Sequence, residues 1–202
     1  MIAALYVQKG GVYYGLPDVD PWDEERDARK YAGPWPVVAH PPCARWCQMA
    51  GLVQHRYPHL KKGEDGGCFA AALAAVRTWG GVLEHPAYTK AWPAHGLIAP
   101  NARTGWQRCL DGGWVCEVAQ VAYGHRGRKL TWLYASLPGT PSPADWRRPP
   151  AFVSMTWCKN HGGAVQRMGH AECSRTPIPF RDFLLSIART CEGADGRRQD
   201  TY

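Results

Sequence analysis

The sequence predicts an α/β protein in which a mixed or mostly parallel sheet is flanked by helices. An alanine-rich stretch at 68–79, with apolar residues at helical spacing, lies between short apolar runs at 37–39 and 82–83. Strand, helix and strand in this order predict parallel strands with helices on their faces. The 202 residues contain no long polar linker, so we expect one domain over 1–190 and a disordered polar tail over 191–202.

The chain begins with an apolar run at 2–7, which predicts a strand. Residues 12–14 continue it either as the second arm of a hairpin or after a glycine turn. Asp20 precedes Pro21 and several acidic residues, an order typical of a helix N-terminus, so a short helix is expected to run to about Arg29.

The middle of the chain supplies the strand, helix and strand named above. The strand at 36–39 is followed by a loop at 45–67, rich in glycine, histidine and lysine, and then by the helix at 68–79. This helix ends at Gly80-Gly81 and leads into the next strand. Three later elements are expected, namely strands at 114–118 and 130–135 and a final helix over about 180–189.

Composition and charge narrow the function classes. A net charge of +7 favours a polyanionic partner such as nucleic acid. The sequence has no secretory leader and no membrane-length apolar run, so we expect a soluble cytoplasmic protein without membrane contact. In a reducing compartment the eight cysteines are expected to be free thiols, ligands or a nucleophile, not disulfides.

One cysteine follows directly after a predicted buried strand. The run at 37–39 stops at His40-Pro41-Pro42 and is followed by Cys43. Parallel sheets bind ligands outside the carboxyl ends of their strands, and a thiol there is positioned as a nucleophile. The alternative is that Cys43 is a small buried hydrophobic residue.

Two further segments carry polar groups at predicted strand ends. Glu84-His85-Pro86 ends the strand after the alanine-rich helix, and His125-Arg126-Gly127-Arg128-Lys129 precedes the strand at 130–135. The three strand ends are therefore expected to meet in one pocket. Each segment also has a simpler interpretation, an exposed strand-end carboxylate for Glu84 and a solvated basic turn for the arginines.

These segments resemble the catalytic core of the DNA cytosine carbon-5 methyltransferases. That family has a Pro-Cys loop, a Glu-Asn-Val segment and a Gln-x-Arg-x-Arg segment in this order, and the matching strings here are Pro42-Cys43, Leu83-Glu84-His85 and Arg126-Gly127-Arg128. A weaker match relates 166–177 to a late motif of the family, and Gly10-Gly11 matches the end of its cofactor loop. The resemblance implies a Rossmann-like methyltransferase sheet with a truncated cofactor half, because the Pro-Cys string follows the glycine pair closely.

The resemblance also implies a mechanism. A pyrimidine ring accepts a group at carbon 5 once a thiolate has added to carbon 6. Cys43 would be this thiol, and Glu84 would hold the ring. Arg126 and Arg128 would stabilise developing charge and lower the pKa of the thiol. Four neighbouring residues are expected to contact the flipped nucleotide: Pro42, His85, His125 and Lys129.

The implied methyl donor is S-adenosylmethionine and the implied partner is DNA. The candidate ligands of S-adenosylmethionine are Gly10, Gly11, Asp18 and Asp20. The family's large target-recognition domain has no counterpart here, so a homo-oligomer or a partner subunit would supply sequence readout. His85 stands where the family has asparagine, which leaves the preference for cytosine open.

Three alternatives stay open. The same thiol addition serves a pyrimidine modification without S-adenosylmethionine, such as hydroxymethylation or deamination. A non-catalytic DNA-binding module is the second. Zinc is not expected, but two sets of Cys/His pairs have compatible spacing: Cys43, Cys47, His55 and His59, and Cys158, His161, His170 and Cys173.

Overall fold

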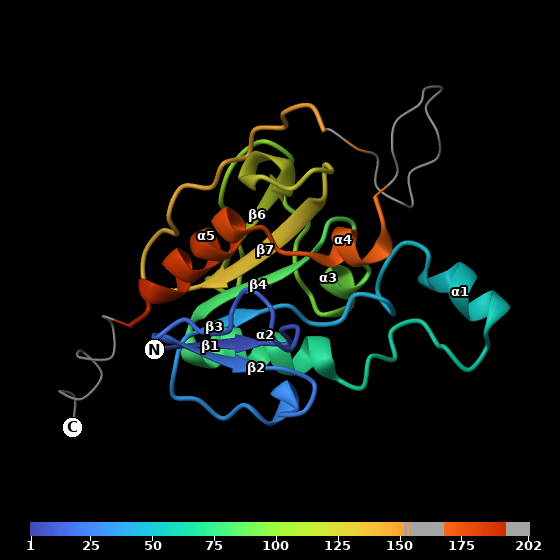
Figure 1. Ribbon diagram of the computed structural model, residues 1–202, viewed down its shortest axis with the longest axis horizontal. Helices are drawn as coiled ribbons and strands as arrows, with labels where there is room; N and C mark the ends of the chain where they lie inside the picture. Colours follow the sequence, from blue (N-terminus) through green and yellow to red (C-terminus); the bar gives the residue numbers. More distant parts are fainter. Residues whose placement is uncertain (152, 154–167, 193–202) are drawn as a thin grey trace.

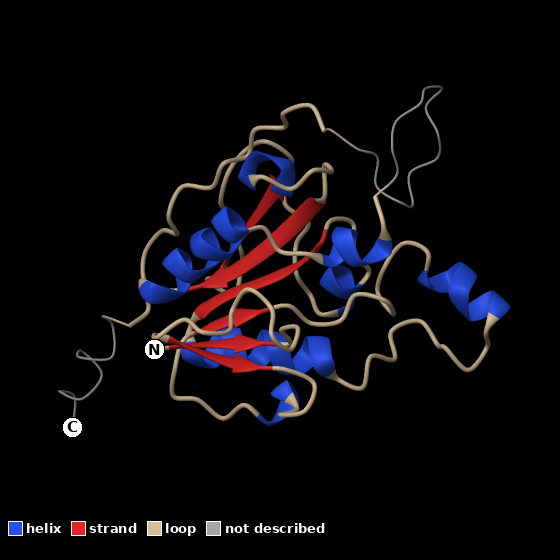
Figure 2. Ribbon diagram, in the orientation of Figure 1, coloured by secondary structure: helices blue, strands red, loops and turns tan. Residues whose placement is uncertain are grey.

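The computed structural model describes residues 1–151, 153 and 168–192, and these form a mixed α/β structure. Its centre is a seven-stranded mixed sheet with the strand order β2-β1-β3-β4-β7-β6-β5. Helices cover both faces of this sheet (Figure 1, Figure 2). The predicted α/β class is thereby confirmed, while the polar tail after residue 192 lies outside the described residues.

The strands are β1 (Ile2–Leu5), β2 (Val19–Trp22), β3 (Val37–Ala39), β4 (Gly81–Pro86), β5 (Gln107–Arg108), β6 (Trp114–Ala119) and β7 (Leu130–Ser136). The helices are α1 (Ala50–Arg56), α2 (Cys68–Trp79), α3 (Ala91–Ala94), α4 (His170–Ser174) and α5 (Ile178–Arg189), with 3-10 turns η1 (Ala28–Lys30) and η2 (Gln120–Tyr123). The expected elements from residue 68 onward are confirmed as α2, β4, β6, β7 and α5. None of the described helices has both the length and the apolar character that crossing a bilayer requires.

The direction of the strands brings several strand ends to one edge of the sheet. β1 is parallel to β2 and to β3, and β3 is parallel to β4. β7 runs antiparallel to both β4 and β6, so β6 points the same way as β4. The carboxyl ends of β1, β2, β3, β4 and β6 and the amino end of β7 therefore lie at one edge, which we call the carboxyl edge.

Alternating side chains of the sheet enter two hydrophobic clusters. Val38 and Val82 pack on the side of α5, whereas Val37 and Leu83 pack on the side of α2. Both faces are buried, so the inner strands are continuous apolar runs in the sequence. Beyond the apolar run of each strand, the same alternation decides which face a polar side chain joins.

The prediction of a helix after Asp20 is wrong. Residues 19–22 form strand β2, which pairs with β1, and only the short η1 follows. The Asp20 carboxylate accepts hydrogen bonds from Arg26 and Trp22 instead of capping a helix. Pro21 is tolerated because β2 is an edge strand and needs no hydrogen-bond donor on its outer side.

The segment 45–67 is not loop throughout, because α1 occupies seven of its residues. Only Ala50 of this helix is buried, so the segment lacks the apolar stripe that predicts a packed helix. Residues 12–14 follow a glycine turn and form no hairpin arm. In this turn the Gly11 backbone N–H donates to Gln8, and the Tyr14 N–H donates to Gly11.

Candidate functional site

A chain of polar side chains lies at the carboxyl edge, on the α5 face of the sheet. His40 directly follows β3 and, by alternation, shares the face of Val38. Glu84 likewise shares the face of Val82 in β4. His40 Nδ1 lies 2.9 Å from Glu84 Oε2, and the hydroxyl of Tyr13, from the loop between β1 and β2, lies 2.8 Å from His40 Nε2.

Chemistry assigns the protons among these three groups. A carboxylate only accepts hydrogen bonds, so His40 Nδ1 carries the proton that is donated to Glu84. In the neutral ring His40 Nε2 then accepts a hydrogen bond from the Tyr13 hydroxyl. Burial and the Glu84 charge raise the pKa of Tyr13, which keeps the phenol protonated as a donor. We call Tyr13, His40 and Glu84 the polar triad.

The other oxygen of Glu84 is also held. Gln120 Nε2 lies 3.3 Å from Glu84 Oε1 and 2.9 Å from Thr131 Oγ1. Gln120 directly follows β6 and Thr131 lies near the amino end of β7, so the polar triad is tied to two further strand ends. Both side chains are buried, which fixes the position of the carboxylate.

Glu84 is ionised although the residue is only 7% exposed. Burial raises the pKa of this carboxyl, but the Lys129 ammonium and the hydrogen bond from His40 outweigh burial and hold the pKa at about 2. Lys129 directly precedes β7 and so lies at the same edge. Two N–H donors and a nearby cation make Glu84 a stable anion at neutral pH.

Cys43 lies in the loop that follows β3. The thiol is partly buried, and the neighbouring Pro42 is exposed. Burial and the charge of Glu84 raise the pKa of Cys43, Lys129 lowers it, and Cys47 raises it further. The net shift is upward, so the thiol is protonated at rest and must lose its proton before it attacks. The charges of Glu84 and Lys129 thus both act on the Cys43 thiol.

The cation that acts on both Cys43 and Glu84 is Lys129. The expectation that Arg126 and Arg128 lower the pKa of the thiol is wrong, because that pKa is raised and Lys129 opposes the rise. Arg126 Nη1 lies 2.7 Å from a carboxylate oxygen of Glu172, and Arg128 is exposed. Three neighbouring cations that are equivalent in the sequence therefore have different surroundings.

His85 and His125 are buried and do not face a ligand. His85 is 1% exposed on the α2 face, with ring centroids 5.2 Å from Phe69 and 6.3 Å from Trp92. Burial lowers the pKa of His85 to about 4, while the Glu84 charge and the backbone of Pro42, in the loop that carries Cys43, oppose this shift. His125 Nδ1 lies 2.8 Å from the Gly127 carbonyl oxygen, inside the turn before β7. One ring packs in the core and the other shapes a turn.

The two glycines proposed to bind S-adenosylmethionine have structural roles in the turn after β1. Gly10 is exposed and has a φ of 65°, in the left-handed region that favours glycine. A Cβ on Gly11 would lie 2.8 Å from the Gln8 carbonyl oxygen, so the tight turn itself requires glycine there. No helix lies between β1 and β2, which removes the helix N-terminus that binds a nucleotide cofactor in dinucleotide-binding folds.

The two aspartates proposed for the same cofactor are each already paired with an arginine. Asp18 precedes β2, at the opposite edge of the sheet from Cys43, and its carboxylate lies 2.7 Å from Arg189. Asp20 is held by Arg26. The residues present therefore do not fit S-adenosylmethionine in the place that the resemblance implies.

Metal-ligand groups are not found in the part of the chain that the structure describes. No three His, Cys, Asp or Glu side chains there are arranged to hold a metal ion, and this part includes Cys43, Cys47, His55 and His59. Of the second set of pairs, Cys158, His161 and the side chain of His170 lie outside the described residues. Cys173 is buried in a small apolar cluster with Val153 and Met168.

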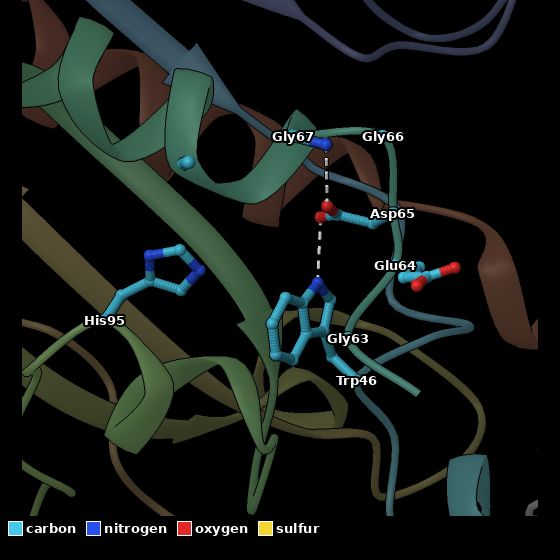
Figure 3. A pocket seen from close by; sticks show the side chains of 8 residues that line it. Trp46, Gly63, Glu64, Asp65, Gly66, Gly67 and His95 are labelled. Atoms are coloured by element: carbon cyan, nitrogen blue, oxygen red, sulfur yellow. Dashed lines mark hydrogen bonds between the residues drawn. The ribbon is translucent and has the colours of Figure 1, made fainter. Parts of the chain in front are cut away.

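A hollow of about 640 Å³ lies at the start of α2 (Figure 3). It is lined by Trp46, His95 and the turn at 63–67, among others. Asp65 accepts hydrogen bonds from the Trp46 indole and from the Gly67 backbone N–H (Figure 3), and also from the Phe69 backbone N–H in the first turn of α2. The polar triad does not line this hollow, so the candidate site is defined by contacts at the carboxyl edge.

Four residues of the site are absent from the sequence predictions: Tyr13, His40, Gln120 and Thr131. His40 carries a usable signal, since it lies two residues beyond Val38 and alternation assigns both to one face. Tyr13 carries none, because its position depends on the path of a loop. No family model, no curated protein and no solved structure matches this chain.

Proposed function

We propose that this protein is an enzyme that modifies a pyrimidine base of DNA through a covalent adduct between Cys43 and ring carbon 6. The observation that carries the proposal is the arrangement of three neighbouring strands: Cys43 follows β3, Glu84 lies near the end of β4 and Lys129 precedes β7, all at the carboxyl edge. A nucleophile, a hydrogen-bond acceptor and a cation around one point are the groups that addition to a ring requires.

The addition proceeds in balanced steps. Cys43 gives its proton to solvent, and the thiolate sulfur bonds to carbon 6 while the electron pair of the carbon 5–carbon 6 double bond moves toward carbon 5. Carbon 5 takes up an electrophile, a solvent proton in the exchange reaction or a one-carbon aldehyde in hydroxymethylation, and then loses its original proton to solvent. The sulfur–carbon bond then breaks and the ring is restored. Glu84 would hold the edge of the ring, and Lys129 would stabilise the negative charge that develops.

Charge supports a nucleic acid as the carrier of the base. The chain has a net charge of +7, and the loop after Cys43 leads into α1, which projects from the body of the molecule (Figure 1). Arg56, Lys61 and Lys62 are exposed on and after this helix. Cations of this kind neutralise backbone phosphates without reading sequence.

The group transferred to carbon 5 is a separate question. Methyl transfer from S-adenosylmethionine is the reaction that the resemblance implies, but Gly10, Gly11, Asp18 and Asp20 do not fit that cofactor, so no methyl-transfer step is derived. The geometry favours the modification that does not use this donor. Calorimetric titration with S-adenosylmethionine is expected to give no saturable heat, and a saturable heat would restore methyl transfer as the first choice.

Exchange of the hydrogen at carbon 5 tests the adduct without knowledge of the co-reactant. In D₂O the adduct takes a deuteron at carbon 5 and loses the original proton, so the released base carries deuterium, which mass spectrometry of the digested nucleosides detects. We expect exchange by the native chain and none by Cys43→Ser. Cys47→Ser is the matched control and should exchange normally. If the native chain exchanged the carbon 5 hydrogen of no substrate, the proposed function would be wrong and the DNA-binding module would be the better interpretation.

A further inference from the structure

The position of Glu84 bears on which pyrimidine the site accepts, and this inference rests on the proposed function. The ring edges of the two pyrimidine types differ. A cytosine ring presents an acceptor at nitrogen 3 and an amino group at carbon 4, whereas a uracil-type ring presents an N–H donor at nitrogen 3 and a carbonyl oxygen at carbon 4. The group that meets nitrogen 3 must therefore donate to cytosine but accept from a uracil-type ring.

Both oxygens of Glu84 already face N–H donors. His40 Nδ1 lies 2.9 Å from Oε2, and Gln120 Nε2 lies 3.3 Å from Oε1. Two N–H donors stabilise the charged form of a carboxyl group, so they disfavour a proton on either oxygen. The second lone pair of each oxygen stays available as an acceptor. Glu84 is thus arranged to accept a hydrogen bond from a substrate and not to donate one.

The surroundings of Glu84 reinforce this arrangement. Tyr13, 3% exposed, donates to His40 Nε2 and so keeps the proton of the imidazole on the nitrogen that faces Glu84. Gln120, 1% exposed, is fixed by Thr131 at 2.9 Å. His40 cannot turn away without leaving the Tyr13 hydroxyl and an oxygen of Glu84 without this partner.

The Lys129 ammonium suits the oxygen at carbon 4 of a uracil-type ring. Addition of sulfur to carbon 6 of such a ring moves negative charge through carbon 5 onto the oxygen at carbon 4, and this enolate oxygen is stabilised by a cation. Lys129 directly precedes β7 at the carboxyl edge, and its charge acts on both Cys43 and Glu84. A cytosine ring would instead require a proton at nitrogen 3 to neutralise the charge.

We propose that the ring accepted by this site is of the uracil type, with an N–H at nitrogen 3 and a hydrogen at carbon 5, and that Glu84, fixed by His40 and Gln120, selects it by accepting the hydrogen bond of nitrogen 3. His40 and Gln120 are positioning residues, because they act through Glu84. The selection is a difference between two rings of the same shape, so it is measurable as a ratio of exchange rates on matched substrates.

The test uses two probes that differ in one base, deoxyuridine or deoxycytidine. Each is offered as a single-stranded oligonucleotide, as a duplex and as the free 5′-monophosphate, and the carbon 5 hydrogen exchange in D₂O is measured by mass spectrometry. We expect exchange on deoxyuridine to exceed exchange on deoxycytidine by at least about tenfold. Uracil serves as the probe because thymine has no hydrogen at carbon 5.

Two variants separate selection from loss of fold. Glu84→Gln replaces the acceptor by an amide that both donates and accepts, so the preference should fall toward equality while the circular dichroism spectrum stays native. Thr78→Ala, on the surface of α2, should keep the full preference. Equal or faster exchange on deoxycytidine by the native chain would overturn this inference and leave the Cys43 adduct standing. No exchange on either base would instead remove the proposed function.

Discussion

Glu84 and His85 are neighbours in β4 with similar burial, 7% and 1% exposed, yet they are opposite in character. Glu84 points to the α5 face, where His40, Gln120 and Lys129 keep it charged. His85 points to the α2 face, where it packs against aromatic rings and stays neutral. Burial alone therefore does not define a functional group, since the partners on each face decide whether a buried polar residue is held for chemistry or for packing.

The largest effect is expected from Glu84→Ala. The change leaves the hydrogen-bond donors of His40 and Gln120 without an acceptor and removes the anion that faces Lys129. We expect a loss of about 3 kcal/mol or more in the free energy of unfolding, measured in urea, and a fall of at least about 100-fold in carbon 5 exchange. Glu172→Ala, which breaks the more exposed pair with Arg126, should cost less than about 1 kcal/mol. Equal losses in the two variants would contradict the special position of Glu84.

The contributions of Glu84 and His85 to the free energy of unfolding should be lost in different pH ranges on acidification. The pKa of His85 is lowered from 6.5 to about 4 by burial, so the unfolded chain binds a proton that the folded chain does not, and stability falls as pH falls through this range. The pKa of Glu84 is lowered from 4.5 to about 2, so its contribution is complete above pH 4.5 and is lost as pH falls to 2.

Variants of the two residues should remove these losses one at a time. His85→Phe should abolish a loss of about 3 kcal/mol between pH 6.5 and 4, and Glu84→Gln should flatten the curve below pH 4.5. Urea unfolding at a series of pH values measures both. If His85→Phe left the first range unchanged, the neutral packing role of His85 would be wrong.

A smaller effect is expected from Tyr13→Phe. The variant keeps the ring in the core but removes the hydroxyl that donates to His40 Nε2, so one buried nitrogen loses its partner. The free energy of unfolding should fall by about 1 kcal/mol. Tyr88→Phe is the control, since that side chain is 48% exposed, and it should change nothing measurable. A Tyr13→Phe variant as stable as the native chain would remove the hydroxyl from the polar triad.

The smallest effect concerns the reactivity of Cys43. Lys129 lowers the pKa of this thiol against the effect of burial and of Glu84, so Lys129→Gln should raise it further and reduce the thiolate fraction at a given pH. Alkylation of Cys43 by iodoacetamide at pH 8, followed by peptide mass spectrometry, should slow by less than about tenfold. Arg128→Gln should leave the rate unchanged. An equal slowing in that variant would indicate that the arginines also lower the pKa of the Cys43 thiol.

Much of the fold could be predicted because local patterns and tertiary packing agree. The alanine-rich helix at 68–79 buries Phe69, Leu73 and Val76 at the spacing that predicts it. Asp20 and Pro21 mislead because their helix-start chemistry is overridden by pairing of their segment with β1. α1 could not be predicted from an apolar stripe, since it buries almost nothing.

The candidate site was predictable only in part, for a similar reason. Cys43, Glu84 and Lys129 lie at strand ends, which the sequence marks by apolar runs that stop. His85 also lies near a strand end, but its side chain is on the α2 face of the sheet, and Asp18 lies beside a strand at the opposite edge. The face depends on register and the edge on strand direction, and a local sequence pattern gives neither. Tyr13 reaches His40 from a loop, and no local pattern encodes that contact.

The decisive experiment measures carbon 5 hydrogen exchange on a deoxyuridine oligonucleotide by Cys43→Ser, Glu84→Ala, His85→Phe and the native chain. We expect Cys43→Ser and Glu84→Ala to lose exchange, whereas His85→Phe, on the opposite face, should exchange within about threefold of the native rate. Exchange that survives Cys43→Ser, or that is lost in a folded His85→Phe variant and kept in Glu84→Ala, would contradict this expectation.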